Sequence, residues 1–394
     1  MCGICGFTGR LLTSEEILEN MMNKIIHRGP DSGGKHIDDG VSMGFRRLSI
    51  IDLEGGTQPI YNENRDMVIT FNGEIYNHQE LREDLIAKGH VMGSHADTEV
   101  LLHGYEEYGE DLLPKLRGMF AFVIWDSKTK TLFGARDFFG IKPFYYSIQN
   151  LVYGSEIKSI LEYPGFKREV NKEALENYLT FQYSVLPETF FKGVFKLPPA
   201  HCFTFKDGKM DIKRYWEPVF EPDHTKSLEQ FVDDIDNAMQ DSIKKHKISD
   251  VEVGCFLSGG VDSSFVASYF GGQKAFTVGF EGGAHYDESA YAAELAGELG
   301  IEHYVHRISE EEYWDALPKV QYALDQPLAD PSCVALYFVS KLAAEHVKVV
   351  LSGEGADELF GGYRIYHEPS SLAGYQKLPR FLRRAAAAGA GAIP

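Results

Sequence analysis

Two cysteines, Cys2 and Cys5, lie close to the chain start. Their thiols could act as nucleophiles, as metal ligands or as a redox pair. If Met1 is removed, the Cys2 thiol lies beside a free α-amine, which titrates near about 7.7 to 8.0 and can act as a general base. A Cys-x-x-Cys zinc or redox pair is the alternative. Zinc needs further Cys or His ligands and a thioredoxin-like pair needs a βαβ context, which residues 1–60 do not provide. We expect Cys2 to be a nucleophile and Cys5 to be a small buried residue on the first strand.

A glycine-rich segment in the second half, SGGVDSS (258–264), has the residue types of a phosphate-binding loop. It follows the apolar run GCFL and precedes a helix-like segment. Backbone N–H groups, serine hydroxyls and a helix N-terminus would all face a phosphate there. The loop lacks the lysine of a Walker loop, so γ-phosphate transfer of the usual kind is not indicated. A plain glycine turn capped by serine is the structural alternative.

A second Ser-Gly segment, SGEGADELFGGY (352–363), follows the apolar run VKVVL and adds the carboxylates of Glu354, Asp357 and Glu358. Oxygen ligands of this kind can hold Mg²⁺ and can take a proton from an amine. The alternative is an acidic first helical turn that the helix dipole favours. Both segments follow strands of one βαβ series, so both can face one crevice at the carboxyl ends of the strands.

Length and composition limit the kind of protein that carries these segments. A chain of 394 residues suits two domains, and no apolar run approaches the roughly 18 residues of a membrane span. Neither a secretory signal nor a disulfide framework is visible, since the five cysteines are scattered and odd in number. We therefore expect a soluble, cytoplasmic protein without a membrane partner. The net charge of −19 argues against a nucleic-acid partner, although an anionic nucleotide can still bind locally.

Hydrophobic periodicity predicts different architectures for the two halves. Residues 1 to about 210 are rich in β-like runs, such as 67–71, 119–125 and 151–154, with two amphipathic helices between them. One helix is expected to bury Leu81, Leu85 and Ile86, and the other to start after a cap at Asp97. After a polar boundary near residue 220, apolar residues keep helical spacing from Leu228 to Ile243. Short strands at 251–257, 275–280, 303–308 and 347–351 then alternate with helices, which predicts a parallel sheet.

The motifs together resemble a known family. LSGGVDSS is similar to the pyrophosphate loop of ATP pyrophosphatases, and LSGEGADELFGGY resembles the matching segment of glutamine-hydrolysing asparagine synthetases. MCGI resembles the start of class II glutamine amidotransferase domains. The first half also carries, in order, HRGPDSGG, FRRLSIID, FNGEIYNH, HADTEV, GMFAFVIWD and RDFFGIKPFYY. The resemblance covers nearly the whole chain.

The resemblance implies a fold and a domain division. The expected fold class is α/β, with an N-terminal Ntn-hydrolase-type α-β-β-α sandwich and a C-terminal parallel α/β domain of the ATP-pyrophosphatase (PP-loop) type. The glutamine amidotransferase domain is expected at 1–215 and the ATP-binding synthetase domain at 216–394. The family's synthetase domain continues further and supplies a catalytic lysine, whereas only 36 residues follow Glu358 here. We therefore expect a chain truncated at its C-terminal end that hydrolyses glutamine but makes asparagine poorly or not at all.

The resemblance also implies a mechanism with two sites. The Cys2 thiolate attacks the glutamine side-chain amide, Asn72 and Gly73 hold the oxyanion, and ammonia leaves. At the second site aspartate attacks the α-phosphorus of ATP, and ammonia then displaces AMP from aspartyl-AMP with the help of Glu354. The implied small-molecule partners are glutamine, aspartate and ATP with Mg²⁺, and a homodimer is left open. An interior tunnel for ammonia is implied by the family alone.

The site residues follow from the same motifs. The implied glutamine-binding residues are Arg47, Leu48, Ser49, Ile50, Ile51, Asn72, Gly73, Glu74 and Asp97. The implied ATP-binding residues are Leu257, Ser258, Gly259, Gly260, Asp262, Ser263, Ser264, Val278, Gly279, Ser352 and Gly353, with Asp262 and Asp357 as candidate Mg²⁺ ligands. Structural alternatives exist for two of these positions, since Asn72-Gly73 is also a hairpin-turn signal and Asp97 could only cap its helix.

Three other functions share some of these features. An amidotransferase that amidates a sugar acid would share both loops and differ in its carboxylate acceptor. A β-lactam synthetase fits less well, because that family has lost the N-terminal cysteine. A non-catalytic interaction protein is disfavoured because Cys2, Asn72, Asp97 and the Ser-Gly-Gly loop are all intact.

Overall fold

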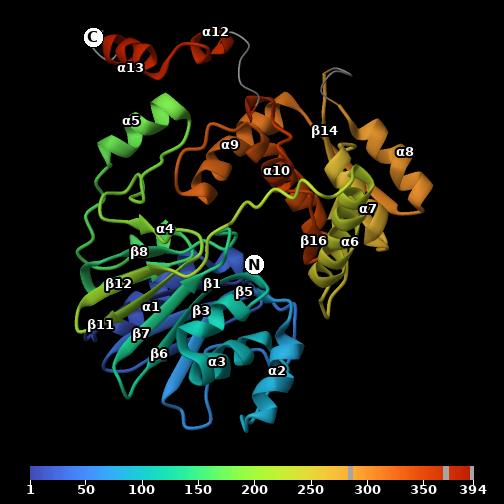
Figure 1. The fold of residues 1–394 in the computed structure, drawn as a ribbon. Coiled ribbons are helices and arrows are strands. Elements are labelled where there is room, and N and C mark those ends of the chain that lie inside the picture. Colours follow the sequence, from blue (N-terminus) through green and yellow to red (C-terminus); the bar gives the residue numbers. More distant parts are fainter. Residues whose placement is uncertain (283–286, 367–371, 391–394) are drawn as a thin grey trace.

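The first half of the protein contains two six-stranded antiparallel sheets. The computed structural model describes residues 1–282, 287–366 and 372–390 (Figure 1). The first sheet has the order β10-β8-β9-β1-β3-β2, and the second has the order β12-β11-β7-β6-β5-β4. The strands of the first sheet are β1 (Gly3–Thr8), β2 (Ser32–Ile37), β3 (Val41–Arg47), β8 (Tyr145–Ser147), β9 (Val152–Gly154) and β10 (Phe195–Lys196). Those of the second are β4 (Ile60–Tyr61), β5 (Met67–Ile75), β6 (Gly118–Asp126), β7 (Thr131–Arg136), β11 (His201–Lys206) and β12 (Lys209–Arg214).

Helices cover the outer face of each sheet, which gives four layers. Helix α1 (Ser14–Lys24) packs on β1 and β3, while α3 (Asp97–Tyr108) packs on β5 and against α2 (His78–Ala87). Short elements complete this half: α4 (Ile157–Ile160), α5 (Lys172–Phe181) and the 3-10 turns Ile26–Arg28, Gly109–Lys115 and Gln149–Leu151. The predicted α-β-β-α sandwich is confirmed.

Successive side chains along the central strands point to opposite faces of the sheet, and both faces are buried. The strand segments are therefore continuous apolar runs in the sequence. In β6, Val123 points into the core between the sheets, whereas Phe122 packs under the outer helices. In β1, Ile4 belongs to the inter-sheet core and Cys5 to the core beneath α1. Both faces of these central strands are buried, so neither face needs polar residues. Cys5 is fully buried on β1, as predicted.

The second half is built on a four-stranded parallel sheet, as predicted. Its order is β15-β14-β13-β16. The strands are β13 (Val253–Phe256), β14 (Lys274–Phe280), β15 (Glu302–Ile308) and β16 (Val349–Leu351). The core on one face includes residues of α6 (Leu228–His246), α7 (Val261–Phe270) and α8 (Ser289–Leu299), and the other face packs on α9 (Glu310–Leu324) and α10 (Ser332–Ala344). The remaining elements are α11 (Ala356–Phe360), the 3-10 turn Arg364–Tyr366, α12 (Ala373–Gln376) and α13 (Arg380–Ala390).

Several polar contacts join the two halves. The backbone N–H of Asp250 donates to Ile50 O at 3.0 Å, and the backbone N–H of Asp52 donates to Asp250 Oδ2 at 2.8 Å. Lys348, which directly precedes β16, forms an ion pair with Asp31 at 2.7 Å. These contacts place the loop after β3 directly beside the parallel sheet.

Some local expectations were wrong. Helix α3 begins at Asp97 itself, with Ala96 at the capping position, so Asp97 is not the cap. Ile86 is half exposed, while Leu85 alone of the predicted apolar face of α2 is fully buried. Helix α6 forms as predicted, but its apolar residues up to Ile235 are exposed and only Ile243 reaches the core.

Two further points concern the whole chain. No helix in the described part of the chain combines the length and the apolar character that a membrane crossing requires. The domain division at residue 215 stays a prediction.

Candidate active sites

Cys2 lies at the entrance to β1, next to the end of β3. Its Sγ accepts a hydrogen bond from the Leu48 backbone N–H, with Sγ and N 3.4 Å apart, and its carbonyl accepts one from Arg28 Nε at 2.9 Å. Burial raises the pKa of the Cys2 thiol above its usual value, and the Leu48 contact opposes that shift. The thiol is therefore protonated near neutral pH and needs a base before it can attack a carbonyl. Cys5 lies on the opposite face of β1, so the two cysteines do not form a pair.

Asn72 and Gly73 lie inside β5, opposite Ala121 and Phe120 of β6. The hairpin-turn alternative is thereby excluded. Asn72 is buried, and neither its Nδ2 nor its Oδ1 has a hydrogen-bond partner among the residues that the structure describes. A buried amide without a partner is costly and commonly marks a functional position. A Cβ on Gly73 would lie 2.1 Å from Met119 O, so only glycine fits.

Two carboxylates and a lysine define the charge of this site. Burial raises the pKa of Asp97 and, together with the nearby charge of Asp97, raises that of Glu74 to about 7. The Asp97 carboxylate accepts a hydrogen bond from the Ile75 backbone N–H at 3.0 Å, which ties the start of α3 to β5. Burial lowers the pKa of Lys142 to about 8. A cation such as an α-ammonium group between the two carboxyl groups would favour their ionised forms and offset the effect of burial.

Arg47 shapes the loop that follows β3. Its guanidinium donates to the carbonyls of Ile51, Asp52 and Leu53 and to Thr57 Oγ1, at 2.5 to 3.3 Å. In the structure the guanidinium therefore holds the loop 48–53 against β3. To bind a carboxylate it would have to exchange some of these carbonyl acceptors, so its role in glutamine binding stays a prediction.

One cavity of about 800 Å³ brings the predicted glutamine residues together. Its lining includes all of them except Ser49: Cys2, Arg47, Leu48, Ile50, Ile51, Asn72, Gly73, Glu74 and Asp97. Ser49 lies in the same loop, where its backbone N–H donates to Asp31 Oδ2 at 2.9 Å. The far wall comes from the second half of the chain, with residues of α10, β16 and the loop that follows it.

The two Ser-Gly loops meet at the reversal of strand order in the parallel sheet. The chain passes from β13 to β14 and β15 on one side, and β16 lies on the other side of β13. Ligands of such sheets bind at this position, beyond the carboxyl ends of the strands. A Cβ on Gly353 would lie 3.0 Å from the backbone of Asp262 and Ser263, so the loop after β16 lies directly on the first turn of α7.

The first loop has the geometry of a helix-terminal phosphate site. Gly259 has a φ of +83°, and Gly260 occupies the cap position of the ten-residue helix α7. Ser258 and Ser263 are linked by a 2.9 Å hydrogen bond between their hydroxyls. Leu257 and Ser264 lie at the two ends of this turn. Val278 and Gly279 lie near the end of β14, where a Cβ on Gly279 would approach Asp287 within 2.4 Å.

A second cavity, of about 490 Å³, lies above the two loops. It is lined by Asp262, Ser352, Gly353 and Glu354, together with other residues of α6, α7 and α11. Asp357 lies in α11 but is not one of the lining residues. Both cavities share part of their lining, namely Glu74, Met119, Val349, Val350, Ser352 and Glu354. The two cavities therefore adjoin at the loop after β16.

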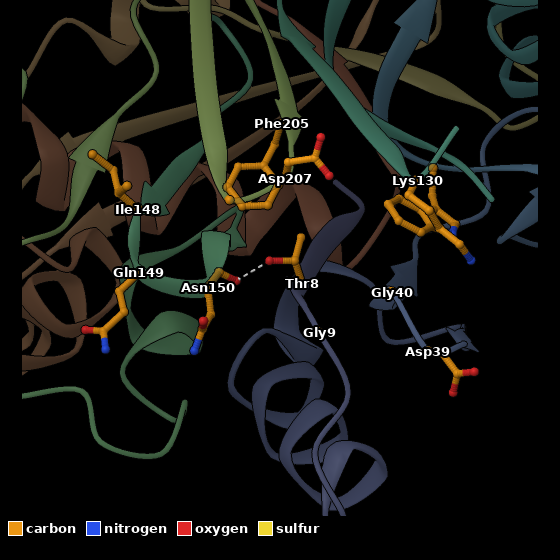
Figure 2. Close-up of a pocket in the computed structure, with 12 residues that line it drawn as sticks. Thr8, Gly9, Asp39, Gly40, Lys130, Ile148, Gln149, Asn150, Phe205 and Asp207 are labelled. Atoms are coloured by element: carbon orange, nitrogen blue, oxygen red, sulfur yellow. Dashed lines mark hydrogen bonds between the residues drawn. The ribbon is translucent and has the colours of Figure 1, made fainter. Parts of the chain in front are cut away.

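A third hollow, of about 630 Å³, lies between the edges of the two antiparallel sheets (Figure 2). Its lining includes Thr8, Asp39, Lys130 and Asn150, and it contains none of the predicted site residues. The predicted glutamine-binding residues gather in the larger cavity, whereas only Asp262, Ser352 and Gly353 of the predicted ATP-binding residues line the smaller one. The other predicted ATP-binding residues line none of these three cavities: Leu257, Ser258, Gly259, Gly260, Ser263, Ser264, Val278 and Gly279.

The sequence-based assignment missed two charged residues near Cys2. Lys142 lines the larger cavity, and its backbone N–H is held by Asp137 Oδ2 at 2.9 Å. Arg28 links the Cys2 carbonyl to Glu156, through a 2.9 Å ion pair. Both residues belong to motifs quoted above, RDFFGIKPFYY and HRGPDSGG, and a lysine or arginine among apolar neighbours was the signal that could have found them.

Comparisons with known proteins identify the families that the two halves of the chain match. Residues 1–216 match the family model described as "Glutamine amidotransferase domain", and residues 234–391 match the one described as "Asparagine synthase". Asparagine synthetase [glutamine-hydrolyzing] 1 of Bacillus subtilis (strain 168) is 46% identical over 97% of this chain and 62% of its own length. Asparagine synthetase [glutamine-hydrolyzing] 3 of the same organism is 35% identical, over 95% of this chain and 65% of its own length. The chain thus spans about three fifths of the length of these curated relatives.

Among solved structures, a glutamine phosphoribosylpyrophosphate amidotransferase from Bacillus subtilis has a TM-score of 0.41 and 15% identity. The alignment covers 77% of this chain and 65% of that one. A likeness of this size adds nothing to the assignment of either site.

Proposed function

The chain belongs to the family of glutamine-hydrolysing asparagine synthetases, and we propose that it transfers ammonia from glutamine to aspartate activated by ATP. The observation that carries this proposal is the adjoining pair of cavities. One contains Cys2 and Asn72, the other is lined by Asp262 of the first Ser-Gly segment and by Ser352 and Gly353 of the second, and Glu354 lines both. A hydrolytic site and a phosphate site that share a wall fit a reaction in which the product of the first is the reactant of the second.

In the proposed glutaminase step, Cys2 Sγ attacks the side-chain amide carbon of glutamine. With Met1 removed, the α-amine of Cys2 would take the thiol proton, and the positive charges of Arg28 and Lys142 nearby would favour its neutral form. Asn72 Nδ2, which lacks a partner in the structure, is the proposed oxyanion donor together with the Gly73 N–H. Glu74 and Asp97 would bind the substrate α-ammonium group. Ammonia leaves with the proton carried by the amine, and water then hydrolyses the thioester to glutamate.

In the proposed synthetase step, ATP lies across the two loops. The backbone N–H groups at 258–260 and the N-terminus of α7 would bind its phosphates. Carboxylates suit Mg²⁺, and Asp262 lines the cavity with Glu354 beside it, whereas Asp357 lies outside the lining. Asp262 is therefore the better-supported ligand of the two predicted ones. Bound Mg²⁺ would neutralise phosphate charge, and aspartate would displace pyrophosphate at the α-phosphorus to give aspartyl-AMP.

The proposed third step is attack of ammonia on the aspartyl carbonyl carbon, with AMP as the leaving group. Ammonia needs a path that excludes bulk water, because protonation to ammonium would remove its nucleophilic lone pair. The wall shared by the two cavities, at Met119, Val349 and Val350, supports such a path. Glu354 lies at its end, where a carboxylate can take a proton from the attacking amine.

Two assays test the proposal. Glutamate release from glutamine should occur in the native protein and disappear in Cys2→Ala. Pyrophosphate release from ATP should depend on aspartate and not on sugar acids; dependence on another carboxylic acid would transfer the function to the alternative acceptor class. The proposal would be overturned if Cys2→Ala kept its glutamate release and Gly353→Val kept its pyrophosphate release. The cytoplasmic location stays a prediction.

A further inference from the structure

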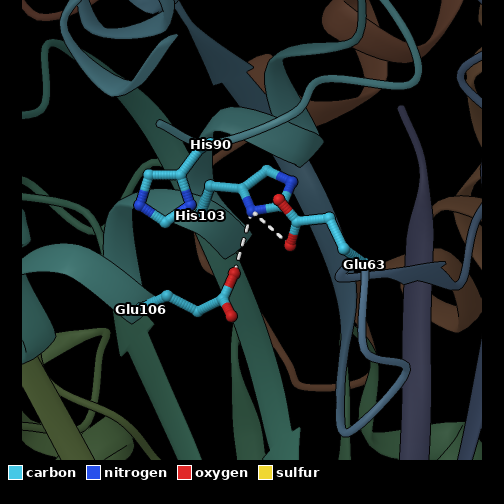
Figure 3. Close-up of side chains that lie close together, drawn as sticks. All are labelled: Glu63, His90, His103 and Glu106. Atoms are coloured by element: carbon cyan, nitrogen blue, oxygen red, sulfur yellow. Dashed lines mark hydrogen bonds and ion pairs between the residues drawn. The ribbon is translucent and has the colours of Figure 1, made fainter. Parts of the chain in front are cut away.

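Two histidines and two glutamates form a cluster in the outer helical layer of the first half (Figure 3). Glu63 lies in the turn between β4 and β5, His90 follows α2, and His103 and Glu106 lie three residues apart on α3. One ligand atom from each residue lies within 4.8 Å of every other. It is the one group of metal-binding composition in the described part of the chain, and none of the four lines either active-site cavity.

The distances within this cluster are close to those of a metal site. His103 Nδ1 is 2.8 Å from Glu106 Oε2 and 3.6 Å from Glu63 Oε2. Zinc bonds to nitrogen and oxygen are about 2.0 to 2.2 Å long, which places tetrahedral ligand atoms about 3.4 Å apart. Ligand atoms that lie as much as 4.8 Å apart must therefore approach each other by up to about 1.4 Å when an ion binds. Glu63 is an exposed residue in a turn, so its side chain can make this movement.

Neighbouring groups hold the ligands in place. The second oxygen of Glu106 accepts a hydrogen bond from Asn62 Nδ2 at 2.7 Å, and Glu63 Oε1 accepts one from the Val91 backbone N–H at 3.0 Å. Outer contacts of this kind orient the ligands of metal sites. The His103 side chain is only 1% exposed, so the site has a buried centre.

The carboxylates around His103 favour the binding of a divalent cation. Glu63, Glu99 and Glu106 all lie within 4 Å of its ring nitrogens. One imidazolium offsets only one of the three negative charges, whereas a divalent ion offsets two.

We propose that Glu63, His90, His103 and Glu106 bind one divalent transition-metal ion, with Zn²⁺ the best match to two imidazoles and two carboxylates. Four protein ligands leave no open position, so the site is structural. The ion would tie together three segments, namely the β4–β5 turn, the end of α2 and α3. His103 is six residues from Asp97 on the same helix, about 9 Å along its axis, so the ion would also fix the helix that presents Asp97 to the glutamine cavity.

Zinc binding to the metal-stripped full-length chain is the direct test. Because thiols also bind zinc, the experiment uses the Cys2→Ala, Cys333→Ser background, which removes the two cysteines that are not buried. Calorimetric titration with ZnCl₂ should give one equivalent of bound Zn²⁺. His90→Gln and Glu63→Gln should each weaken the affinity at least tenfold. His306→Gln, which alters a His–Glu pair of 3.4 Å elsewhere, is the matched control and should leave the affinity unchanged.

A second readout separates a bound metal from an ion pair alone. Amide hydrogen exchange of residues 88–100 should slow on addition of Zn²⁺ in the background protein and not in Glu63→Gln. Glu63 and His90 are chosen for substitution because they lie outside the buried centre, and circular dichroism confirms that the variants are folded. Absence of stoichiometric binding, or equal affinity in all variants, would overturn the proposal and leave His103 as the centre of an ion-paired cluster.

Discussion

Replacing Asn72 by leucine should raise stability and remove glutaminase activity at the same time. Both polar atoms of the Asn72 side chain are buried without a partner among the described residues, and leaving such a group unpaired costs about 1 to 3 kcal/mol. Leucine is similar in size and has no polar atom, and the side chain lines a cavity of about 800 Å³ that can take it. We expect Asn72→Leu to raise the free energy of unfolding by about 1 to 3 kcal/mol.

The same substitution removes the proposed oxyanion donor. Loss of one such donor typically lowers kcat by about 10² to 10³, or about 2.7 to 4 kcal/mol of transition-state stabilisation. Urea unfolding gives the stability, and glutamate release at saturating glutamine gives kcat. The two changes should therefore have opposite signs.

Gln58 provides a matched control for this experiment. It is also a buried amide, but its Oε1 accepts from the Phe71 backbone N–H at 2.6 Å and its Nε2 donates to Phe71 O at 3.2 Å. Gln58→Leu leaves these backbone groups unpaired and should lower stability by about 1 to 3 kcal/mol. A destabilised Asn72→Leu protein that keeps its kcat would refute the assignment of Asn72 as an unpaired, substrate-directed amide.

Three other outcomes follow from specific contacts. Gly353→Val places side-chain atoms against the first turn of α7, which should cost about 1 to 3 kcal/mol of stability. The variant should bind a fluorescent ATP analogue more weakly and keep its glutaminase activity. Unchanged ATP binding would contradict the contact between the two loops. Burial raises the pKa of Glu74 to about 7, so the KM for glutamine should increase as the pH falls below 7 and this carboxylate is protonated, and Glu74→Gln should flatten the profile. Burial opposes ionisation of Glu156, but His27, Lys158 and Arg28 outweigh it and lower its pKa to about 2. Its stabilising effect should be complete above about pH 4.5 and should be lost as the pH falls through about 2. At neutral pH the wild type should be about 3 to 5 kcal/mol more stable than Glu156→Gln. Denaturant titrations should show this difference disappear as the pH falls over that range.

The periodicity of apolar residues predicted helices and strands well where an element is a single apolar run buried in the core. The strands of the parallel sheet were placed within a few residues because each is a short apolar run between helices. Ile86 shows the limit of the same reasoning, because it lies on the flank of the α2 apolar face and the neighbouring helix does not reach it. Helix α6 was predicted from the spacing of its apolar residues alone. That spacing does not show which of these residues pack against other elements.

The candidate sites were predicted from motifs more than from geometry. Asn72-Gly73 is a turn signal by local preference, and only its pairing with β6 places it inside a strand. Lys142 lies 140 residues from Cys2 in sequence and enters the same cavity through tertiary packing, which no local pattern encodes. The cluster of Glu63, His90, His103 and Glu106 likewise draws on three separate segments, so no local sequence pattern shows that its members meet.

The position of β16 has a consequence for the emerging polypeptide. This strand is the last to join its sheet, yet the loop after it forms one wall of both cavities. A nascent chain from which only the four-layer sandwich has emerged lacks the part of the Cys2 cavity wall that residues 336–354 provide. One segment therefore completes both cavities, and neither cavity can reach its final shape before residues 349–354 have been synthesised.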